Sequence, residues 1–326
     1  MTDSLFKSRL YSSTAATLLA LTGLAPAEPV MAAKCLFVSS YHQGYAWSDG
    51  VEQGLREVLV GHCDLRQFDM DSKRRKSEQE KQQAAEAARN LIETWQPDVV
   101  IAADDNAAKY LIEPFFKDHE TPFVFCGVNW SAEEYGFPFS NVTGIVEVAP
   151  IEPLLNRAYE IVSPAKRAIY LGADTLTERK NLERFQRATA RLGIDLESRL
   201  VEDTEGWLKA YRDGQTTDFL ILGSNSGIND WDPALIADAL PTASHRLTVT
   251  THGWMMPYSM FGLTKVPQEH GAWAAETALE ILRGTPPDEI PIITNRKWDV
   301  WANRELLSAA GIELPRHLSH KAKRVQ

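Results

Sequence analysis

The stretch DVVIAA at residues 98–103 is the clearest buried strand of the chain, and DFLILG at residues 218–223 echoes it. A short apolar run of this kind, bounded by turn and polar residues, is typical of a strand that is covered on both faces. Outward from these runs, from residue 34 onward, short apolar or β-branched segments alternate with helical patterns. This alternation predicts βαβ units with parallel sheets, arranged in two halves.

The alternation places most of the expected elements. Expected strands of the first half lie at 35–40, 65–70, 98–103, 122–127 and 142–146, with helices at 48–60, 77–95 and 106–116. Expected strands of the second half lie at 168–171, 196–201, 218–223 and 247–250, with helices at 153–162, 176–192, 205–211 and 233–240. A helix at 268–282, strands at 290–293 and 297–301 and a short helix through Leu307 follow. Residues 314–326 are basic, and we expect a frayed tail there.

Composition and charge exclude several classes of function. The 326 residues include 44 acidic and 34 Lys or Arg side chains, which gives a formal net charge of −10. Nucleic acid is therefore an improbable main partner, because phosphate binding needs a cationic face. Three scattered cysteines do not make a disulfide framework or a zinc cluster. A single bridge between Cys35 and Cys63 is left open, since neighbouring strands could bring them together but the sequence does not give their Cα separation.

Residues 1–33 have the layout of a secretory signal peptide. Lys7 and Arg9 precede an apolar segment at 14–25, and small residues follow it up to Ala33. The apolar segment is shorter than the roughly 20 residues that a membrane span needs. We therefore predict export to the periplasm with removal of this leader, an uncleaved anchor or a disordered tail being the alternatives.

Aromatic and polar side chains follow the expected strands, at the edge of the sheet where open α/β folds bind their ligands. Aromatic rings cost little entropy to fix and pack well on flat ligands, so these loops predict a small-molecule site. Of Asp104 and Asp105, one could cap the helix that starts there and the other could meet an amine. The candidate ligand-binding residues are Tyr41, His42, Tyr45, Trp47, Asp104, Asp105, Asn129, Trp130, Ser224, Asn225 and Trp254.

Signatures of enzymes are mostly absent. GSNSG at 223–227 resembles a nucleophile elbow, but Asn225 stands where serine is required. No glycine-rich phosphate loop follows a strand, and the eight histidines show no metal-ligand spacing. The basic run KRRK at 73–76 is expected to be a solvated helix entrance. We predict that the protein is not an enzyme and holds no cofactor or metal, a secreted α/β hydrolase being the alternative from another class.

The loop SSYHQGYAW at 39–47 resembles the first-strand loop of ABC transporter substrate-binding proteins with the type I periplasmic-binding fold. The similarity is to the subgroup that includes tryptophan- and tyrosine-transport-like proteins and the sensing domains of some membrane sensors. It continues in order through the motifs PDVVI at 97–101, DDNA at 104–107, PFVFCGVN at 122–129, VTGI at 142–145, EHGAWAA at 269–275 and LRGTP at 282–286.

This resemblance implies two doubly wound parallel-sheet lobes joined by a three-crossing hinge, which close around a small molecule. The crossings are expected near 145–148, 251–257 and 290–298. The expected N-terminal lobe is residues 34–146 plus 256–292, and the expected C-terminal lobe is 147–255 plus part of 293–313. The resemblance implies ligand contacts at Tyr41, Trp47, Asp104, Asn129 and the loop at Asn225.

The implied function is an extracytoplasmic solute-binding protein. Its expected partners are a small-molecule ligand, with an amino acid or aromatic zwitterion as the candidate, and an ABC permease in the inner membrane. A ligand-sensing partner of a membrane sensor kinase or cyclase is the alternative on the same fold.

Overall fold

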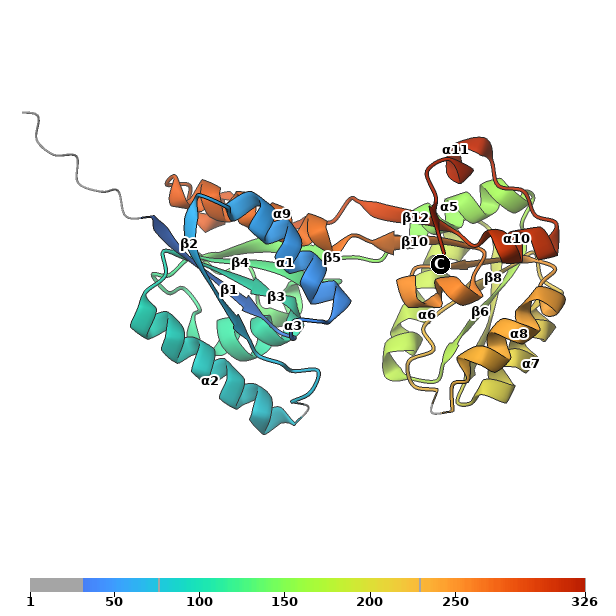
Figure 1. Ribbon diagram of the computed structural model, residues 1–326, viewed down its shortest axis with the longest axis horizontal. Helices are drawn as coiled ribbons and strands as arrows, with labels where there is room; N and C mark the ends of the chain where they lie inside the picture. Colours follow the sequence, from blue (N-terminus) through green and yellow to red (C-terminus); the bar gives the residue numbers. More distant parts are fainter. Residues whose placement is uncertain (1–31, 76, 229, 326) are drawn as a thin grey trace, which may run out of the picture. The chain divides into compact units, whose positions relative to one another are not determined.

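A computed structural model describes residues 32–75, 77–228 and 230–325 of the chain (Figure 1). The predicted signal peptide lies outside these residues, except for its last two positions. Two mainly parallel sheets organise the described part of the chain. The strand order is β11-β5-β4-β3-β1-β2 in the first sheet and β13-β12-β10-β9-β8-β6-β7 in the second. Each sheet and its helices are called a lobe below, and the architecture is the α/β fold with two lobes that the sequence predicts.

The first lobe combines an N-terminal segment with one helix and one strand from far along the chain. Its strands are β1 (Ala33–Ser39), β2 (Cys63–Asp69), β3 (Val99–Ala103), β4 (Phe123–Asn129), β5 (Val142–Glu147) and β11 (Ile293–Thr294). Its helices are α1 (Ala46–Leu59), α2 (Glu78–Trp95), α3 (Asp104–Ala107), the π-helix η1 (Ala108–Ile112), α4 (Glu113–Phe115), α9 (Pro267–Leu282) and the 3₁₀ turns η2 (Glu133–Tyr135) and η4 (Pro287–Glu289). The predicted helix at 106–116 is thus three short helices in sequence.

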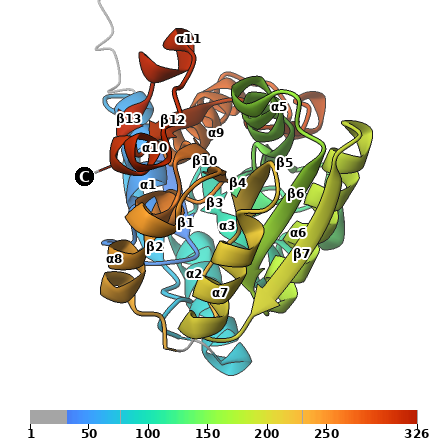
Figure 2. The same cartoon turned by 90° about the vertical axis from the view of Figure 1, so that its right-hand side faces the viewer.

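The second lobe contains the middle of the chain and its C-terminus (Figure 2). Its strands are β6 (Arg167–Ala173), β7 (Asp195–Val201), β8 (Phe219–Leu222), β9 (Leu247–Thr250), β10 (Phe261–Lys265), β12 (Trp298–Ala302) and β13 (Lys323–Arg324). Its helices are α5 (Ile151–Val162), α6 (Leu176–Arg191), α7 (Thr204–Gly214), α8 (Pro233–Ala243), the 3₁₀ helix η3 (Gly253–Tyr258), α10 (Arg304–Ala310) and α11 (Arg316–Ser319).

Glycines bring α9 against α1, and α1 and α9 lie side by side on the first sheet (Figure 1). A Cβ on Gly271 would overlap the carbonyl oxygen of Val51, and a Cβ on Gly54 would overlap that of Gln268. Only glycine therefore permits this approach of the two backbones. The buried apolar residues of α1 and α9 pack together on one face of the sheet, in a cluster that includes Val51, Leu55 and Ala274.

Three crossings connect the lobes, at residues 147–151, 265–267 and 294–298. The prediction that the middle crossing falls within 251–257, with 256–292 in the first lobe, is wrong for residues 256–265. β10 pairs parallel with β9 and antiparallel with β12, so it belongs to the second sheet. The sequence signal was weak because the strand is short and Gly262 interrupts its apolar run.

The C-terminal segment is also more ordered than predicted. β13 extends the second sheet, with Lys323 opposite Trp301. Leu318 in α11 is buried against the core of the second lobe. The frayed tail expected from the basic composition is therefore wrong, because one apolar side chain anchors an otherwise polar segment.

The disulfide left open by the sequence is present. Cys35 in β1 and Cys63 at the start of β2 are bonded, with their Cα atoms 5.7 Å apart. The parallel register explains the approach, because Cys63 pairs with Ala33, two residues before Cys35 on the same strand. Cys126 is free and buried.

Reduction of this bridge is expected to lower the free energy of unfolding by about 3 kcal/mol, because the bond constrains a segment of moderate length in the unfolded chain. The two cysteines are 28 residues apart. Urea unfolding with and without dithiothreitol measures the effect, and Cys126→Ser serves as the control that keeps the bridge. Denatured, unreduced protein should give one free thiol per chain, and a count of three would contradict the bridge.

Candidate functional site

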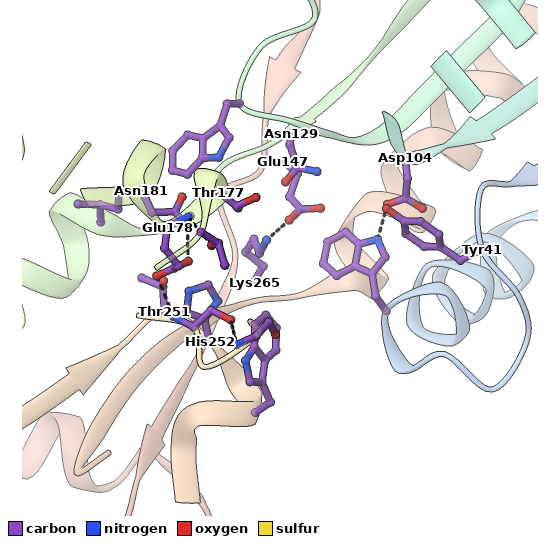
Figure 3. Close-up of a pocket in the computed structure, with 18 of the residues that line it drawn as sticks. Tyr41, Asp104, Asn129, Glu147, Thr177, Glu178, Asn181, Thr251, His252 and Lys265 are labelled. Atoms are coloured by element: carbon purple, nitrogen blue, oxygen red, sulfur yellow. Dashed lines mark hydrogen bonds and ion pairs between the residues drawn. The ribbon is translucent and has the colours of Figure 1, made fainter. Parts of the chain in front are cut away.

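Residues that follow the carboxyl ends of strands in both sheets line one cavity of about 460 Å³ (Figure 3). From the first lobe these are the loop after β1, the start of α3 after β3, and the ends of β4 and β5. From the second lobe they are the first half of α6, the loops after β8 and β9, and the end of β10. This is the position that parallel α/β sheets use for ligands, and its volume suits a small molecule.

Eight of the eleven predicted binding residues line this cavity: Tyr41, Tyr45, Trp47, Asp104, Asn129, Trp130, Ser224 and Trp254. His42, Asp105 and Asn225 do not. Lining residues that the sequence did not single out as binding residues include Lys73, Glu147, Thr175, Thr177, Glu178, Asn181, Phe185, Ser226, Thr251, His252 and Lys265.

Asp104 forms a buried acidic point on the first-lobe wall. The indole Nε1 of Trp47 donates a 2.7 Å hydrogen bond to Asp104 Oδ1, while the buried Oδ2 has no partner. The backbone of Asp104 is left-handed, with φ +70°, a strained conformation that non-glycine residues adopt mainly at constrained sites. Burial raises the pKa of Asp104 to about 8, against the lowering effect of the Trp47 hydrogen bond. The carboxyl group is thus placed to accept a hydrogen bond from a cationic ligand. The charge of such a ligand would also favour the ionised form of the carboxyl group.

Gly127 makes room for this carboxyl group. Its φ is +71°, and a Cβ there would lie 2.8 Å from Asp104 Oδ1 and 3.5 Å from Trp47 Nε1. An alanine would therefore press on the Asp104–Trp47 hydrogen bond. The glycine in the predicted fourth strand is required by the site as well as by the backbone.

Asp105 supports the wall without lining the cavity. Its carboxylate accepts hydrogen bonds from Asn129 Nδ2 at 2.5 Å, from Asn129 N at 3.1 Å and from the Tyr135 hydroxyl at 2.9 Å. Neighbouring residues at a helix start point in different directions, so Asp105 faces Asn129 while Asp104 faces Trp47. The helix-cap role considered for one of the pair is not seen, because Ala103 is the N-cap of α3 and no side chain caps it.

Tyr41 and Tyr45 form an aromatic corner with a cation above it. Their ring centroids are 5.3 Å apart in an edge-to-face arrangement. Lys73 Nζ lies 4.5 Å from the Tyr41 centroid and 4.9 Å from that of Tyr45, within cation–π range. Lys73 is exposed, as expected of the basic run, and in addition it lines the cavity.

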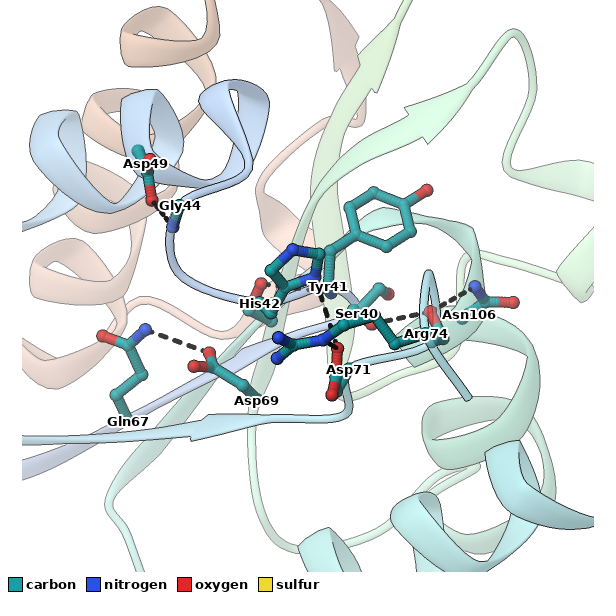
Figure 4. Close-up of polar contacts among 12 residues, drawn as sticks. Ser40, Tyr41, His42, Gly44, Asp49, Gln67, Asp69, Asp71, Arg74 and Asn106 are labelled. Atoms are coloured by element: carbon teal, nitrogen blue, oxygen red, sulfur yellow. Dashed lines mark hydrogen bonds and ion pairs between the residues drawn. The ribbon is translucent and has the colours of Figure 1, made fainter. Parts of the chain in front are cut away.

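A small polar network holds the Lys73 loop against the first strand (Figure 4). Ser72 N donates to Ser40 O at 2.9 Å, and the Arg74 Nε donates to Asp71 Oδ1 at 2.7 Å. His42 Nδ1 lies 3.3 Å from the same Asp71 oxygen. His42, predicted as a ligand contact, therefore faces this loop, because the backbone sends consecutive side chains to opposite sides and Tyr41 takes the cavity side.

Glu178 organises the second-lobe wall. Its buried carboxylate accepts hydrogen bonds from the Tyr170 hydroxyl at 2.5 Å, from Ser224 N at 2.9 Å and from Asn181 Nδ2 at 2.8 Å. Gly172 and Gly223 leave the space that Glu178 Oε2 fills, since a Cβ on either would collide with it. The loop after β8 is thereby fixed with Ser224 and Ser226 toward the cavity. Asn225 between them does not line the cavity, although the sequence predicts it as a binding residue from its place after this strand.

His252 and Trp254 complete the second-lobe wall. Their rings lie 4.6 Å apart between centroids, and 55% of Trp254 is exposed. Burial lowers the pKa of His252 below its usual range, so the imidazole is neutral at pH 7. The wall thus offers a neutral ring pair beside the hydroxyl groups of Thr251 and Ser224.

An ion pair between two crossings forms the floor of the cavity. Glu147 ends β5 at the first crossing, Lys265 ends β10 at the second, and their side chains are paired (Figure 3). Burial lowers the pKa of Lys265 to about 8, against the raising effect of Asp104 and Asp105. The sequence signal for both residues was a single charge at the end of an apolar strand, which does not reveal that the two strand ends meet.

The third crossing is tied to the other two by hydrogen bonds. Asn295 Oδ1 accepts from Val148 N at 2.7 Å, which joins it to the first crossing. Glu269, in the first turn of α9 just after the second crossing, accepts from Arg296 N and Lys297 N, both at 2.8 Å. The three crossings therefore form one connected floor.

No group of three or more His, Cys, Asp or Glu residues that could hold a metal ion occurs in the part of the chain that the structure describes. Among the same residues, no helix combines the length and apolar character that a membrane span requires.

Comparison with solved structures identifies the fold. A ligand-free, open substrate-binding protein with adhesive properties from Clostridium difficile matches with a TM-score of 0.72 at 14% identity, over 90% of this chain and 99% of that one. An ABC domain in complex with L-Trp from Streptococcus pneumonia matches with a TM-score of 0.62 at 14% identity, over 90% and 100%. A periplasmic ribose ABC transporter structure from Conexibacter woesei matches with a TM-score of 0.57 at 12% identity, over 90% and 98%.

These likenesses establish that the chain has the two-lobed, type I periplasmic-binding fold. No protein-family model matches the sequence, and no curated protein does. The class defined so far is that of two-lobed α/β proteins with a small-molecule cavity between the strand ends of their two sheets.

Proposed function

We propose that this chain is an extracytoplasmic solute-binding protein that encloses one small molecule between its lobes and delivers it to an ABC importer. The observation that carries the proposal is a single cavity lined by strand ends of both sheets, with the hinge crossings as its floor. Hinge motion at such crossings encloses a ligand in proteins of this architecture. The signal-peptide layout of residues 1–33 supports action in the periplasm.

We further propose that the ligand is an aromatic amino acid or a similar aromatic zwitterion. Asp104 offers an unpartnered carboxyl oxygen to an ammonium group. Tyr41, Trp47 and Trp130 offer rings for an aromatic side chain. The 16-residue helix α6 begins beside the cavity, and its N-terminus favours a carboxylate. The resemblance to tryptophan- and tyrosine-transport-like proteins supports the same ligand class.

Isothermal titration calorimetry against tryptophan, tyrosine and phenylalanine tests this ligand class. Each amino acid is compared with the matching amine, which lacks the carboxylate, and with the matching arylpropionate, which lacks the ammonium group. At least one amino acid is expected to bind at one site per chain, with its arylpropionate about 100-fold weaker, because Asp104 would lose its cationic partner. Absence of binding by all three amino acids would refute the ligand class.

A further inference from the structure

A second cavity lies across the hinge, beside the one described above. Its volume is about 480 Å³. Its walls include Trp130 at the end of β4, the first crossing at 148–153, the third crossing around Trp298, and one face of α6. It therefore contains residues of both lobes and of two of the three crossings. We call it the hinge groove.

Three arginines of α6 line the hinge groove: Arg184, Arg187 and Arg191. They lie at intervals of three and four residues along the helix. The buried Ala188 lines the groove with them, and Phe185 is buried in the core of the second lobe. Seven residues of α-helix span about 10 Å. The groove thus presents a row of guanidinium groups, in a chain whose formal net charge is −10.

Two of these guanidinium groups lack an acidic partner. Arg191 pairs with Glu152 across the groove. Within the described residues, Arg184 and Arg187 form no ion pair. Arg184 instead lies on the ring of Trp130, with its Cζ 3.9 Å from the ring centroid. Burial, and after it the charge of Arg187, lower the pKa of Arg184, while Glu183 and Glu134 offset part of that effect.

We propose that the hinge groove is the docking site of an acidic segment of the membrane partner, whose carboxylates would pair with Arg184 and Arg187. This inference rests on the proposed function, because it presumes a membrane protein that receives the binding protein. An acidic segment fits better than a single small anion, because the groove sets the two unpaired guanidinium groups beside the rings of Trp130 and Trp298, which suit the apolar atoms of a peptide. Because both lobes form its walls, the groove changes shape when the hinge closes. The affinity of the partner for the groove therefore depends on whether the cavity holds a ligand.

The test uses a fluorescein-labelled peptide of six glutamates, with blocked ends, and measures its binding to the full protein by fluorescence anisotropy at low ionic strength. Arg187→Glu is expected to weaken binding at least tenfold, because Arg187 is exposed and lines the hinge groove but not the ligand cavity. Arg212→Glu is the matched control, since Arg212 is an exposed arginine on α7 of the same lobe. This control variant changes the net charge by the same amount, and its affinity for the peptide should stay within about twofold of the wild type. Equal loss in both variants, or no binding by the wild type, would overturn the proposal.

Two further arms separate the alternatives. Inorganic phosphate at the same charge concentration should not displace the peptide, and full displacement would show a small-anion site in place of a docking surface. Saturation with a mixture of tryptophan, tyrosine and phenylalanine should change peptide affinity at least threefold, because ligand and partner are linked through closure. An unchanged peptide affinity would overturn the claim that the groove changes with hinge closure. Peptide binding that is lost in Arg187→Glu supports the groove even if no aromatic amino acid binds the cavity, so failure of the two proposals can be told apart.

Discussion

Replacing Asp104 by asparagine is expected to weaken binding of an aromatic amino acid by about 100-fold, close to 3 kcal/mol. Asparagine has the same shape and can still accept the Trp47 hydrogen bond, so the wall of the cavity should keep its geometry. What it loses is the negative charge that the ligand ammonium group induces by displacing the carboxyl proton. Titration calorimetry on the wild type and the variant measures this loss.

The pH dependence of stability in the same variant shows the effect of Asp104 on folding, apart from its effect on binding. The pKa of Asp104 is about 8 in the folded protein, above its usual value of 3.8. Between these two pH values the folded protein holds a proton that the unfolded chain releases, so this group makes stability fall as pH rises. Asp104→Asn should remove that contribution and gain stability relative to the wild type at pH 8. Asp238→Asn, at an exposed position of α8, is the control for a simple change of charge. Wild-type ligand affinity in Asp104→Asn would refute the role assigned to Asp104.

Replacing Lys265 by methionine is expected to lower the free energy of unfolding by about 3 kcal/mol, because it leaves the buried Glu147 carboxylate without its cation. Glu147 is 5% exposed, so water cannot replace the lost partner. The double variant Glu147→Gln with Lys265→Met removes both charges and should recover most of the loss. Urea unfolding of the two single variants and the double variant measures the coupling between the two residues.

This double-mutant cycle tests whether the ion pair stabilises the floor that the three crossings form. If Lys265→Met were within about 0.5 kcal/mol of the wild type, the two charges would be screened and the pair would not stabilise the floor. Lys209→Met provides the comparison, because Lys209 pairs with Asp213 on the exposed surface of α7. Such an exposed pair should contribute less than about 1 kcal/mol.

The strands with continuous apolar runs could be predicted, because such a run by itself indicates a strand that is buried on both faces. DVVIAA became β3, and Asp104 directly after it lines the cavity, since the carboxyl ends of parallel strands share one edge. β10 was missed because its pairing with β12, rather than its own pattern, makes it a strand. The directions of Asp104, Asp105 and His42 were not predictable either, because they depend on a left-handed residue and on a loop after β2.

Contacts between distant segments limited the prediction of the site most. Glu147 and Lys265 are 118 residues apart and meet only because two crossings converge. Glu178 looks like an ordinary charge in the first turn of a helix, yet Gly172 and Gly223 give it a buried position. The sequence around each of these three residues is equally typical of an exposed surface position.

The central claim is that the two lobes close on a small molecule in the cavity. The most direct test is the distance between spin labels at Arg75→Cys and Glu205→Cys, measured by pulsed electron paramagnetic resonance. Both residues are exposed and follow the carboxyl end of a strand, β2 in the first lobe and β7 in the second. A saturating mixture of tryptophan, tyrosine and phenylalanine is expected to shift the distribution to one shorter, narrower distance. An identical distribution with and without the mixture would contradict the account.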